Sequence, residues 1–464
     1  MTLTDMTLTD TVLDHLSTHV PFAELQHLTV GLVAVPGDAD YEALVSPWNL
    51  AVAVRPAAVL AAATAHDVVE AVRFAARHDL LVTPQATGHG AMAELVGELL
   101  VATSGLDECV VHPEGWARVG AGVKWARVVE AAAPYGLAPL SGSTTDVGVV
   151  GYTTGGGLGP MARTYGLAAD RVRAFEVVTG DGVLRRATPT EHPDLFFGLR
   201  GGKGTLGIVT AVEFDLVHQP TFLGGSLWFD GADAAAVVER WRDWCTDLPE
   251  LGTTSFALFR LPAMPGVPPQ LAERLTLSVR YVWTGDAAEG ERRFAPMRAA
   301  APVLLDDVAV KPYAAIDSVH TDPLDPMPAT EAAAVLTGFP AEAAAALLAV
   351  AGPASTSPQV LVEVRQMGGA VARGGEHPSA FCSRGAAYAV LLVGIPGVPG
   401  VAEHAEQVIR TMGPWVGGHR MPNFTFDPGR LVEAYDAPTL TRLRAAIGTY
   451  DPDGVMAIGH ALDV

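Results

Sequence analysis

The glycine-rich segment SGSTTDVGVVGYTTGGGLGP, residues 141–160, restricts the fold of this chain more than any other feature. Its glycine run at 155–159 is flanked by the apolar stretches VGVVGY and MARTYGL rather than by Ser, Asn or charged residues. Consecutive glycines beside apolar residues favour a backbone that packs closely against a flat or anionic group. A flexible surface loop is the alternative, and these residues alone favour neither interpretation.

A second glycine-rich segment, Gly202-x-Gly204-x-x-Gly207, matches the dinucleotide-binding fingerprint letter by letter. That fingerprint needs a strand before it and a helix after it, so that the pyrophosphate meets the N-terminus of the helix. The residues that follow here, IVTAVEF, predict a strand, so we reject a Rossmann-type NAD site. We also reject a phosphate-binding loop of the NTPase kind, because Lys203 is followed by glycine and not by Ser or Thr.

His89, in TPQATGHGAM, lies directly after a predicted strand and between Gly88 and Gly90. This position presents the imidazole ring on a turn and leaves the backbone amides around it free to bind an anion. A lone histidine is more often structural, so His89 becomes informative only together with its neighbours.

The first part of the chain predicts a crossover unit. A strand that ends at Pro56, a helix capped by Thr64 and the strand LLVTPQ follow one another. Further on, KWARVVEAAAPYGL predicts a helix closed by Gly136. In AFEVVTGDGVLRRAT, the pair Asp181-Gly182 predicts the turn of a hairpin.

The pattern changes at Gln219-Pro220, where we place a domain boundary. The strands SFALFRLP, LTLSVRYVWTG, VLVEVRQMGG and AYAVLLVGIP alternate with Ala-rich helices such as AAAVVERWRDWC and PAEAAAALLAVA. Such an alternation predicts an antiparallel sheet covered by helices. We therefore predict an α+β fold with domains at 1–219 and 220–420 and a C-terminal segment at 421–464.

Charge and cysteine content exclude several classes of function. The 30 basic and 51 acidic residues give a net charge of −21, which argues against nucleic-acid binding. Cys109, Cys245 and Cys382 lie far apart, so we predict neither a metal site nor a disulfide framework. With no signal peptide and no apolar stretch of ~18–20 residues, we expect a cytoplasmic protein without a membrane partner. The sequence leaves open whether the chain forms a homodimer.

Four ordered blocks carry a resemblance to a known family. They are TPQATGHGA, ARVGAGVKWARVVEAAAPYGLAPLSGS, DVGVVGYTTGGGLGPMARTYGLAAD and HPDLFFGLRGGKGTLGIVTAVEF. Together they resemble the FAD-binding module of the vanillyl-alcohol-oxidase / p-cresol-methylhydroxylase (PCMH) superfamily, and most closely its berberine-bridge-enzyme-like branch. The glycine-rich loop is similar to that of actinobacterial members of secondary metabolism, including the enterocin favorskiiase.

The resemblance covers residues 50–219, and more weakly 359–464. It implies a PCMH-type FAD-binding domain at 1–219, a substrate-binding domain at 220–420 and a segment at 421–464 that returns to the FAD domain. It also implies FAD as the cofactor.

The resemblance further implies that His89 bonds covalently to the 8α-methyl group of FAD. Relatives with a second, cysteinyl link carry Cys three positions before a Val-Gly pair; Thr144 stands there, so we expect a single attachment. Lys203, Thr205 and Leu206 replace the usual Gly-Asn-Phe, and we expect them to alter packing rather than binding. The implied FAD contacts, with Val209 near the adenine half, are Ala86, Thr87, Gly88, His89, Gly90, Ala91, Gly142, Thr144, Thr145, Gly148, Gly151, Tyr152, Gly155, Gly156, Gly157, Gly159, Val209 and Asn423.

The catalytic base is missing from its usual place. Relatives often carry Tyr-x-Asn in the tail, whereas here Met421 replaces the Tyr and cannot accept a proton, although Asn423 can still reach the flavin. Glu363, in VLVEVRQMGG, alternates with its valine neighbours and so points to the opposite face of its strand. If that face lines the cavity, burial would raise the pKa of Glu363 into a useful range. The alternative is a structural pair with Arg365, and Tyr281 is a second candidate base that also fits a core position.

The resemblance implies an FAD-dependent oxidase. A base would remove an acidic proton from the substrate, the flavin would accept a hydride, and O2 would reoxidise it to give H2O2. We expect the substrate to be a small hydroxylated, phenolic or polyketide-like molecule. Two alternatives remain: an oxidative cyclase or oxygenase of secondary metabolism, which the missing tail Tyr fits, and a redox-silent flavin-binding protein.

Overall fold

A small mixed sheet begins the N-terminal domain. The computed structural model describes residues 20–92 and 98–462 and orders the strands of this sheet β1 (Leu32–Ala34), β2 (Ala58–Ala61), β4 (Leu99–Ala102) and β3 (Val82–Gln85). β1 pairs antiparallel with β2, whereas β2, β4 and β3 run parallel. Parallel neighbours need a crossover connection, and helix α4 (Ala65–Arg77) provides it.

The start of α4 confirms the predicted crossover unit, with one correction. The hydroxyl of Thr64 accepts the amide hydrogen of Asp67, which caps the helix as its sequence predicts. The strand predicted to end at Pro56 lies elsewhere, because β2 begins only at Ala58, where pairing with Leu99 starts. Proline has no amide hydrogen to give to a ladder, so the strand forms after it.

A five-stranded antiparallel sheet completes this domain. Its order is β5 (Cys109–His112), β6 (Trp116–Gly120), β10 (Ile208–Asp215), β8 (Val172–Val178) and β9 (Leu184–Ala187). β8 pairs with β9 across the predicted turn, where Gly182 adopts a left-handed φ of 69°. The hairpin prediction is therefore confirmed.

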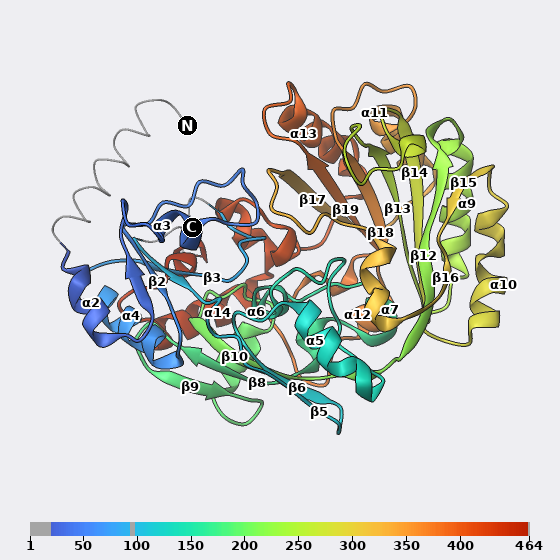
Figure 1. Ribbon diagram of the computed structural model, residues 1–464. Helices are drawn as coiled ribbons and strands as arrows, with labels where there is room; N and C mark the ends of the chain where they lie inside the picture. Colours follow the sequence, from blue (N-terminus) through green and yellow to red (C-terminus); the bar gives the residue numbers. More distant parts are fainter. Residues whose placement is uncertain (1–19, 93–97, 463–464) are drawn as a thin grey trace.

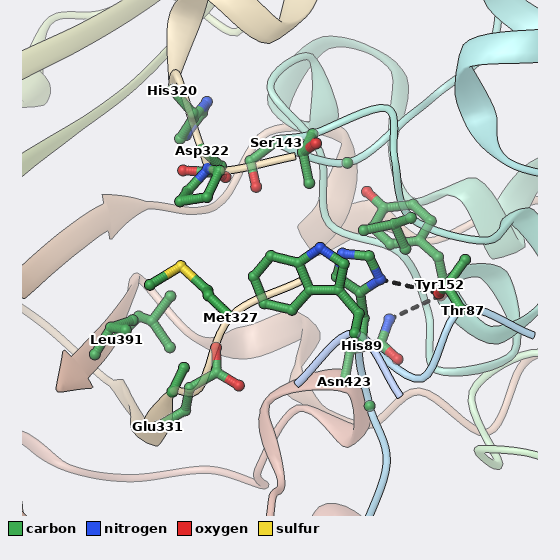
Figure 2. Close-up of a pocket in the computed structure, with 18 of the residues that line it drawn as sticks. Thr87, His89, Ser143, Tyr152, His320, Asp322, Met327, Glu331, Leu391 and Asn423 are labelled. Carbon is green, nitrogen blue, oxygen red and sulfur yellow. Dashed lines mark hydrogen bonds between the residues drawn. The ribbon is translucent and has the colours of Figure 1, made fainter. Parts of the chain in front are cut away.

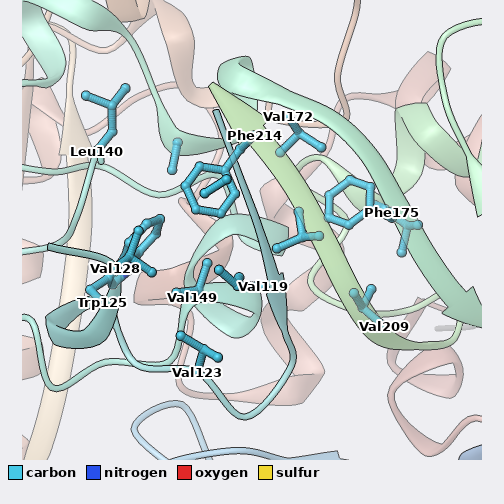
Figure 3. Close-up of a cluster of buried hydrophobic side chains, with 14 of the residues drawn as sticks. Val119, Val123, Trp125, Val128, Leu140, Val149, Val172, Phe175, Val209 and Phe214 are labelled. Atoms are coloured by element: carbon cyan, nitrogen blue, oxygen red, sulfur yellow. The ribbon is translucent and has the colours of Figure 1, made fainter. Parts of the chain in front are cut away.

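The core of the N-terminal domain fixes the glycine-rich segment against this sheet. Helix α5 (Trp125–Ala132) packs Trp125 on Phe214 of β10, with ring centroids 5.5 Å apart (Figure 3). Part of the glycine-rich segment forms a short helix, α6 (Val149–Thr154), and Val149 is buried in the same cluster. The run at 155–159 follows directly, so it is held by a packed core and is not a free surface loop.

An eight-stranded antiparallel sheet forms the second domain (Figure 1). Its order is β15 (Val303–Asp306), β12 (Thr221–Asp230), β14 (Leu275–Trp283), β13 (Gly252–Arg260), β18 (Leu361–Gln366), β19 (Tyr388–Gly394) and β17 (Thr330–Leu336), with β16 (Ala309–Pro312) paired to β12. One face packs on the helices α9 (Ala234–Thr246), α10 (Ala287–Arg298), α11 (Ala341–Ala351) and α13 (Val401–Thr411). The predicted α+β class, with an antiparallel sheet covered by helices, is confirmed.

The tail lies on the N-terminal domain. Helix α14 (Ala437–Tyr450) contacts α8 (Pro193–Leu199), and the amide of Val82 in β3 donates to the carbonyl of Val455 at 2.8 Å. The domain limits at 219 and 420 stay predictions. The remaining helices and strands are α2 (Phe22–Leu28), α3 (Tyr41–Val45), β7 (Leu137–Ala138), α7 (Ala162–Tyr165), β11 (Val217–His218) and α12 (Ala370–Arg373). In the described part of the chain, no helix combines the length and apolar composition that a membrane span requires.

Candidate functional site

A cavity of about 1100 Å3 lies between the two domains. Its walls are the loop at 84–92, the glycine-rich segment, the tail around Asn423 and the uncovered face of the eight-stranded sheet. Pockets that hold one small ligand span roughly 300–1,000 Å3, so this cavity has room for more than one small molecule.

Most residues predicted to contact a cofactor line this cavity. They are Ala86, Thr87, Gly88, His89, Gly90, Ala91, Gly142, Thr144, Gly148, Gly151, Tyr152, Gly155, Gly157, Val209 and Asn423. The structure thus brings together in one place residues that the sequence distributes over more than 300 positions.

Three predicted contacts, Thr145, Gly156 and Gly159, are not among the residues that line the cavity, and each interacts closely with another part of the protein. Thr145 uses its amide and its hydroxyl to donate to the carboxylate of Asp317, at 2.8 and 2.5 Å. A Cβ on Gly156 would lie 2.5 Å from the Phe381 ring, and a Cβ on Gly159 would collide with a backbone carbonyl. These two glycines are needed for packing inside the loop, and the contact of either one with a ligand stays a prediction.

Two other glycines leave space open toward the cavity. Gly151 and Gly204 line it, and a Cβ added to either would meet no atom of the described residues within 4 Å, apart from the adjoining backbone. At these two points of the cavity wall, no side chain covers the backbone. Such a wall suits a flat group that approaches the main chain closely.

His89 is held at this cavity by two neighbours (Figure 2). Its Nδ1 is 2.9 Å from the hydroxyl of Thr87, and its ring stacks on Trp48 with centroids 4.4 Å apart. Its Nε2 is buried and has no hydrogen-bond partner among the described residues. Burial is the largest effect and, with the positive charge of Lys124, lowers the pKa of His89 to about 4 against the opposing charge of Asp146. The imidazole is therefore neutral at pH 7, and one of its nitrogens keeps a lone pair for bonding.

Lys203 contributes to the site, contrary to the expectation that it only alters packing. It lines the cavity, and its Nζ donates to Oδ1 of Asn423 at 3.0 Å. Burial lowers its pKa to about 8. The residue holds a left-handed φ of 60°, a conformation that favours the glycine expected there. The carboxamide of Asn423 also donates to the carbonyl of Tyr152 at 2.7 Å, so it ties the tail to the glycine-rich segment.

Glu363 faces the cavity, as its alternation in β18 predicts, but its charge is fully compensated. Oε1 accepts from Arg280 at 2.8 Å and Oε2 accepts from Arg365 at 3.0 Å, while all three side chains are buried. Burial opposes ionisation, yet the two guanidinium groups and His320 outweigh it and hold the pKa of Glu363 well below its usual range. The expectation of a raised pKa is therefore wrong, and Glu363 is a poor proton acceptor.

Tyr281 is a core residue. It is fully buried among the residues of β14 that face the covering helices, and its ring stacks on Phe294 at 4.6 Å. Its hydroxyl donates to the carbonyl of Gly290, and it does not line the cavity. Tyr281 therefore lies on the face of the sheet away from the cavity, where it cannot contact a ligand bound there.

Sequence reasoning missed many residues of the cavity wall, among them Trp48, Asp322 and Glu331. The signal for Glu331 is a single acidic residue in the apolar strand TEAAAVL. Trp48 and Asp322 lie in irregular segments, where no periodicity shows which way a side chain points. In the described ranges, no group of three or more His, Cys, Asp or Glu residues is arranged to hold a metal ion.

Comparisons with known proteins agree with this geometry. Residues 56–188 match the family model described as the FAD binding domain. The chain is 33% identical over 219 residues to the FAD-linked oxidoreductase sorD of Penicillium rubens, with 46% of each chain covered. It is 27% identical over 298 residues to (R)-6-hydroxynicotine oxidase of Paenarthrobacter nicotinovorans, with 63% of each covered. The matched part thus spans between about half and two thirds of these curated relatives.

The fold has a clear counterpart among solved structures. Berberine bridge enzyme from Eschscholzia californica superposes with a TM-score of 0.79 at 17% identity, covering 94% of this chain and 97% of the other. The predicted fold of the berberine-bridge-enzyme type is confirmed, and residues 56–188 are similar to the FAD binding domain of the family model. The similarity to actinobacterial members stays a prediction.

Proposed function

We propose that the cavity binds FAD, that His89 carries it on a covalent bond to the 8α-methyl group, and that the chain oxidises a small hydroxylated, phenolic or polyketide-like molecule with O2 as electron acceptor. The observation that carries this proposal is the state of His89, a neutral ring with one buried, unpartnered nitrogen in a glycine-walled cavity. The FAD binding domain and the names of the two relatives support it. A cytoplasmic location and a homodimer stay predictions.

The residues of the cavity fit the roles that this proposal gives them. Bound FAD would supply the redox chemistry, taking two electrons from the substrate and passing them to O2. The bare backbone at Gly151 and Gly204 would receive its flat ring system. Trp48 fixes the plane of the His89 ring and Thr87 fixes its Nδ1, so the ring is oriented before it bonds. Apolar side chains of the sheet would exclude water from the substrate.

Anaerobic reduction tests the proposed activity. The purified flavoprotein is mixed with a panel of alcohols, phenols and polyketide-like compounds, and we expect at least one donor to bleach the visible absorbance of the flavin. Admission of air should restore the colour and release one H2O2 per flavin. A product that carries an oxygen atom from 18O2 would replace this proposal with the oxygenase alternative. A flavin that dithionite reduces but no organic donor reduces would favour the redox-silent one.

NADH and NADPH should not reduce the flavin rapidly. The fingerprint Gly202-x-Gly204-x-x-Gly207 leads directly into strand β10, so it offers no helix N-terminus to a pyrophosphate. Stopped-flow absorbance under anaerobic conditions measures this result. Fast, stoichiometric bleaching by either nucleotide would show that the chain accepts electrons from a nicotinamide.

A further inference from the structure

Glu331 is an acidic residue on the cavity wall without a hydrogen-bond or ion-pair partner among the described residues. It lies in β17, at the edge of the eight-stranded sheet, and lines the same cavity as His89 and Asn423 (Figure 2). Its carboxylate makes no hydrogen bond or ion pair with any residue that the structure describes. Glu331 is half-buried, and polar groups that are withdrawn from bulk water normally have partners, so a carboxylate without one at a cavity wall is positioned to bind something that enters the cavity.

Two charged groups act on Glu331 from other elements. Asp322, in the irregular segment before β17, adds a like charge, and Lys203, in the loop after α8, adds an opposite one. Burial, the largest effect, and the charge of Asp322 raise the pKa of Glu331 to about 7 against the opposing charge of Lys203. Glu331 can therefore gain or lose a proton near neutral pH.

The contrast with Glu363 separates two roles on one sheet. Glu363 accepts from two arginines and stays ionised, so its oxygens are occupied by the protein. Glu331, two strands away across β19, has no hydrogen bond to either oxygen from the residues that the structure describes. A catalytic base needs both a free lone pair and an affinity for the proton close to the working pH, and Glu331 satisfies both conditions.

We propose that Glu331 is the proton acceptor of the reaction and that the substrate carries a hydroxyl or amine whose polar hydrogen faces this carboxylate. The proposal deepens the proposed function and rests on it. The substrate H–C–X–H, with X oxygen or nitrogen, would lose its X–H hydrogen as a proton to Glu331. The C–H hydrogen and two electrons would leave to FAD, so that a C=X bond forms. Reoxidation would pass the two electrons and the transferred hydrogen to O2, and release of the proton held by Glu331 would supply the second hydrogen of H2O2.

The first arm of the test needs no substrate. Infrared difference spectra of the holoenzyme between pH 5 and pH 9 report the C=O stretch of protonated carboxyl groups. We expect the wild type to show a band that disappears with a midpoint near pH 7, and Glu331→Gln to lack that band. Asp322→Asn is the matched variant, because loss of the like charge should move the midpoint to lower pH. A spectrum without any band that depends on Glu331 would overturn the proposal.

The second arm uses whichever alcohol or amine of a panel reduces the flavin fastest. Glu331→Gln should slow flavin reduction by about 10²–10⁴-fold and should remove the rise of the rate between pH 6 and pH 8. Reduction by dithionite, which needs no base, should be unchanged. If the variant holds flavin and reacts as fast as the wild type, Glu331 is not the proton acceptor and the proposed function stands. If the wild type holds no flavin at all, the proposed function itself fails.

Discussion

His89→Ala is expected to abolish covalent flavin attachment while the folded protein still binds FAD. The other cavity residues remain in this variant, including the bare backbone at Gly151 and Gly204. After acid precipitation the wild-type pellet should stay yellow, whereas the flavin of the variant should appear entirely in the supernatant. The absorbance of pellet and supernatant measures this difference. We expect the wild-type pellet to retain all of its flavin and the pellet of the variant to retain none.

Cysteine variants provide the control for this result. The sequence predicts a single covalent bond between protein and flavin, because Thr144 occupies the position where relatives with a second bond carry Cys. Ser in place of Cys109, Cys245 or Cys382 should leave the flavin in the pellet. A yellow pellet from His89→Ala would show that another residue carries the bond.

Glu363→Gln is expected to lower the free energy of unfolding by about 3–5 kcal/mol. The substitution keeps the shape of the side chain but leaves Arg280 and Arg365 without their shared counter-charge, and the three side chains are at most 10% exposed. Urea unfolding of both proteins at pH 7 measures the loss. A change below about 1 kcal/mol would show that water or a bound ligand compensates the two arginines.

The pH dependence of this loss follows from the lowered pKa of Glu363. A carboxyl group whose pKa is lower in the folded chain than in the unfolded chain stabilises the folded chain at pH values above its unfolded pKa of 4.5. That contribution disappears as the pH falls below 4.5 toward the folded value, so the difference between wild type and variant should shrink there. The exposed pair of Glu406 with Arg410 is the matched control, and Glu406→Gln should cost no more than about 0.5 kcal/mol.

The sequence predicted those parts of the site that depend on local chain geometry. The residues from Ala86 to Ala91 could be assigned because a strand, a turn and flanking glycines specify the position of His89 without distant partners. The antiparallel sheet could be predicted because its strands and helices have distinct periodicities. The same local rules cannot separate two roles at Gly156 and Gly159, because a glycine needed for packing looks identical in sequence to a glycine needed for a ligand.

The electrostatic character of the site depends on contacts that the sequence does not display. Arg280 lies 83 positions before Glu363, and only the strand order β14, β13, β18 brings the two together. Pairing with Arg365 was foreseen as an alternative, but its effect on the pKa of Glu363 needed the second arginine. Glu331 was missed for the same reason, since the direction of its side chain depends on the register between β17 and β19.

The most direct test of this account is the mass of the peptide that contains His89. The wild-type protein is denatured, digested and analysed by mass spectrometry with fluorescence detection of flavin. We predict that flavin fluorescence elutes with the peptide around TPQATGHGAM, that this peptide carries the added mass of FAD, and that fragmentation places the added mass on His89. A His89 peptide of unmodified mass in protein that contains flavin would contradict the covalent bond on which the account rests.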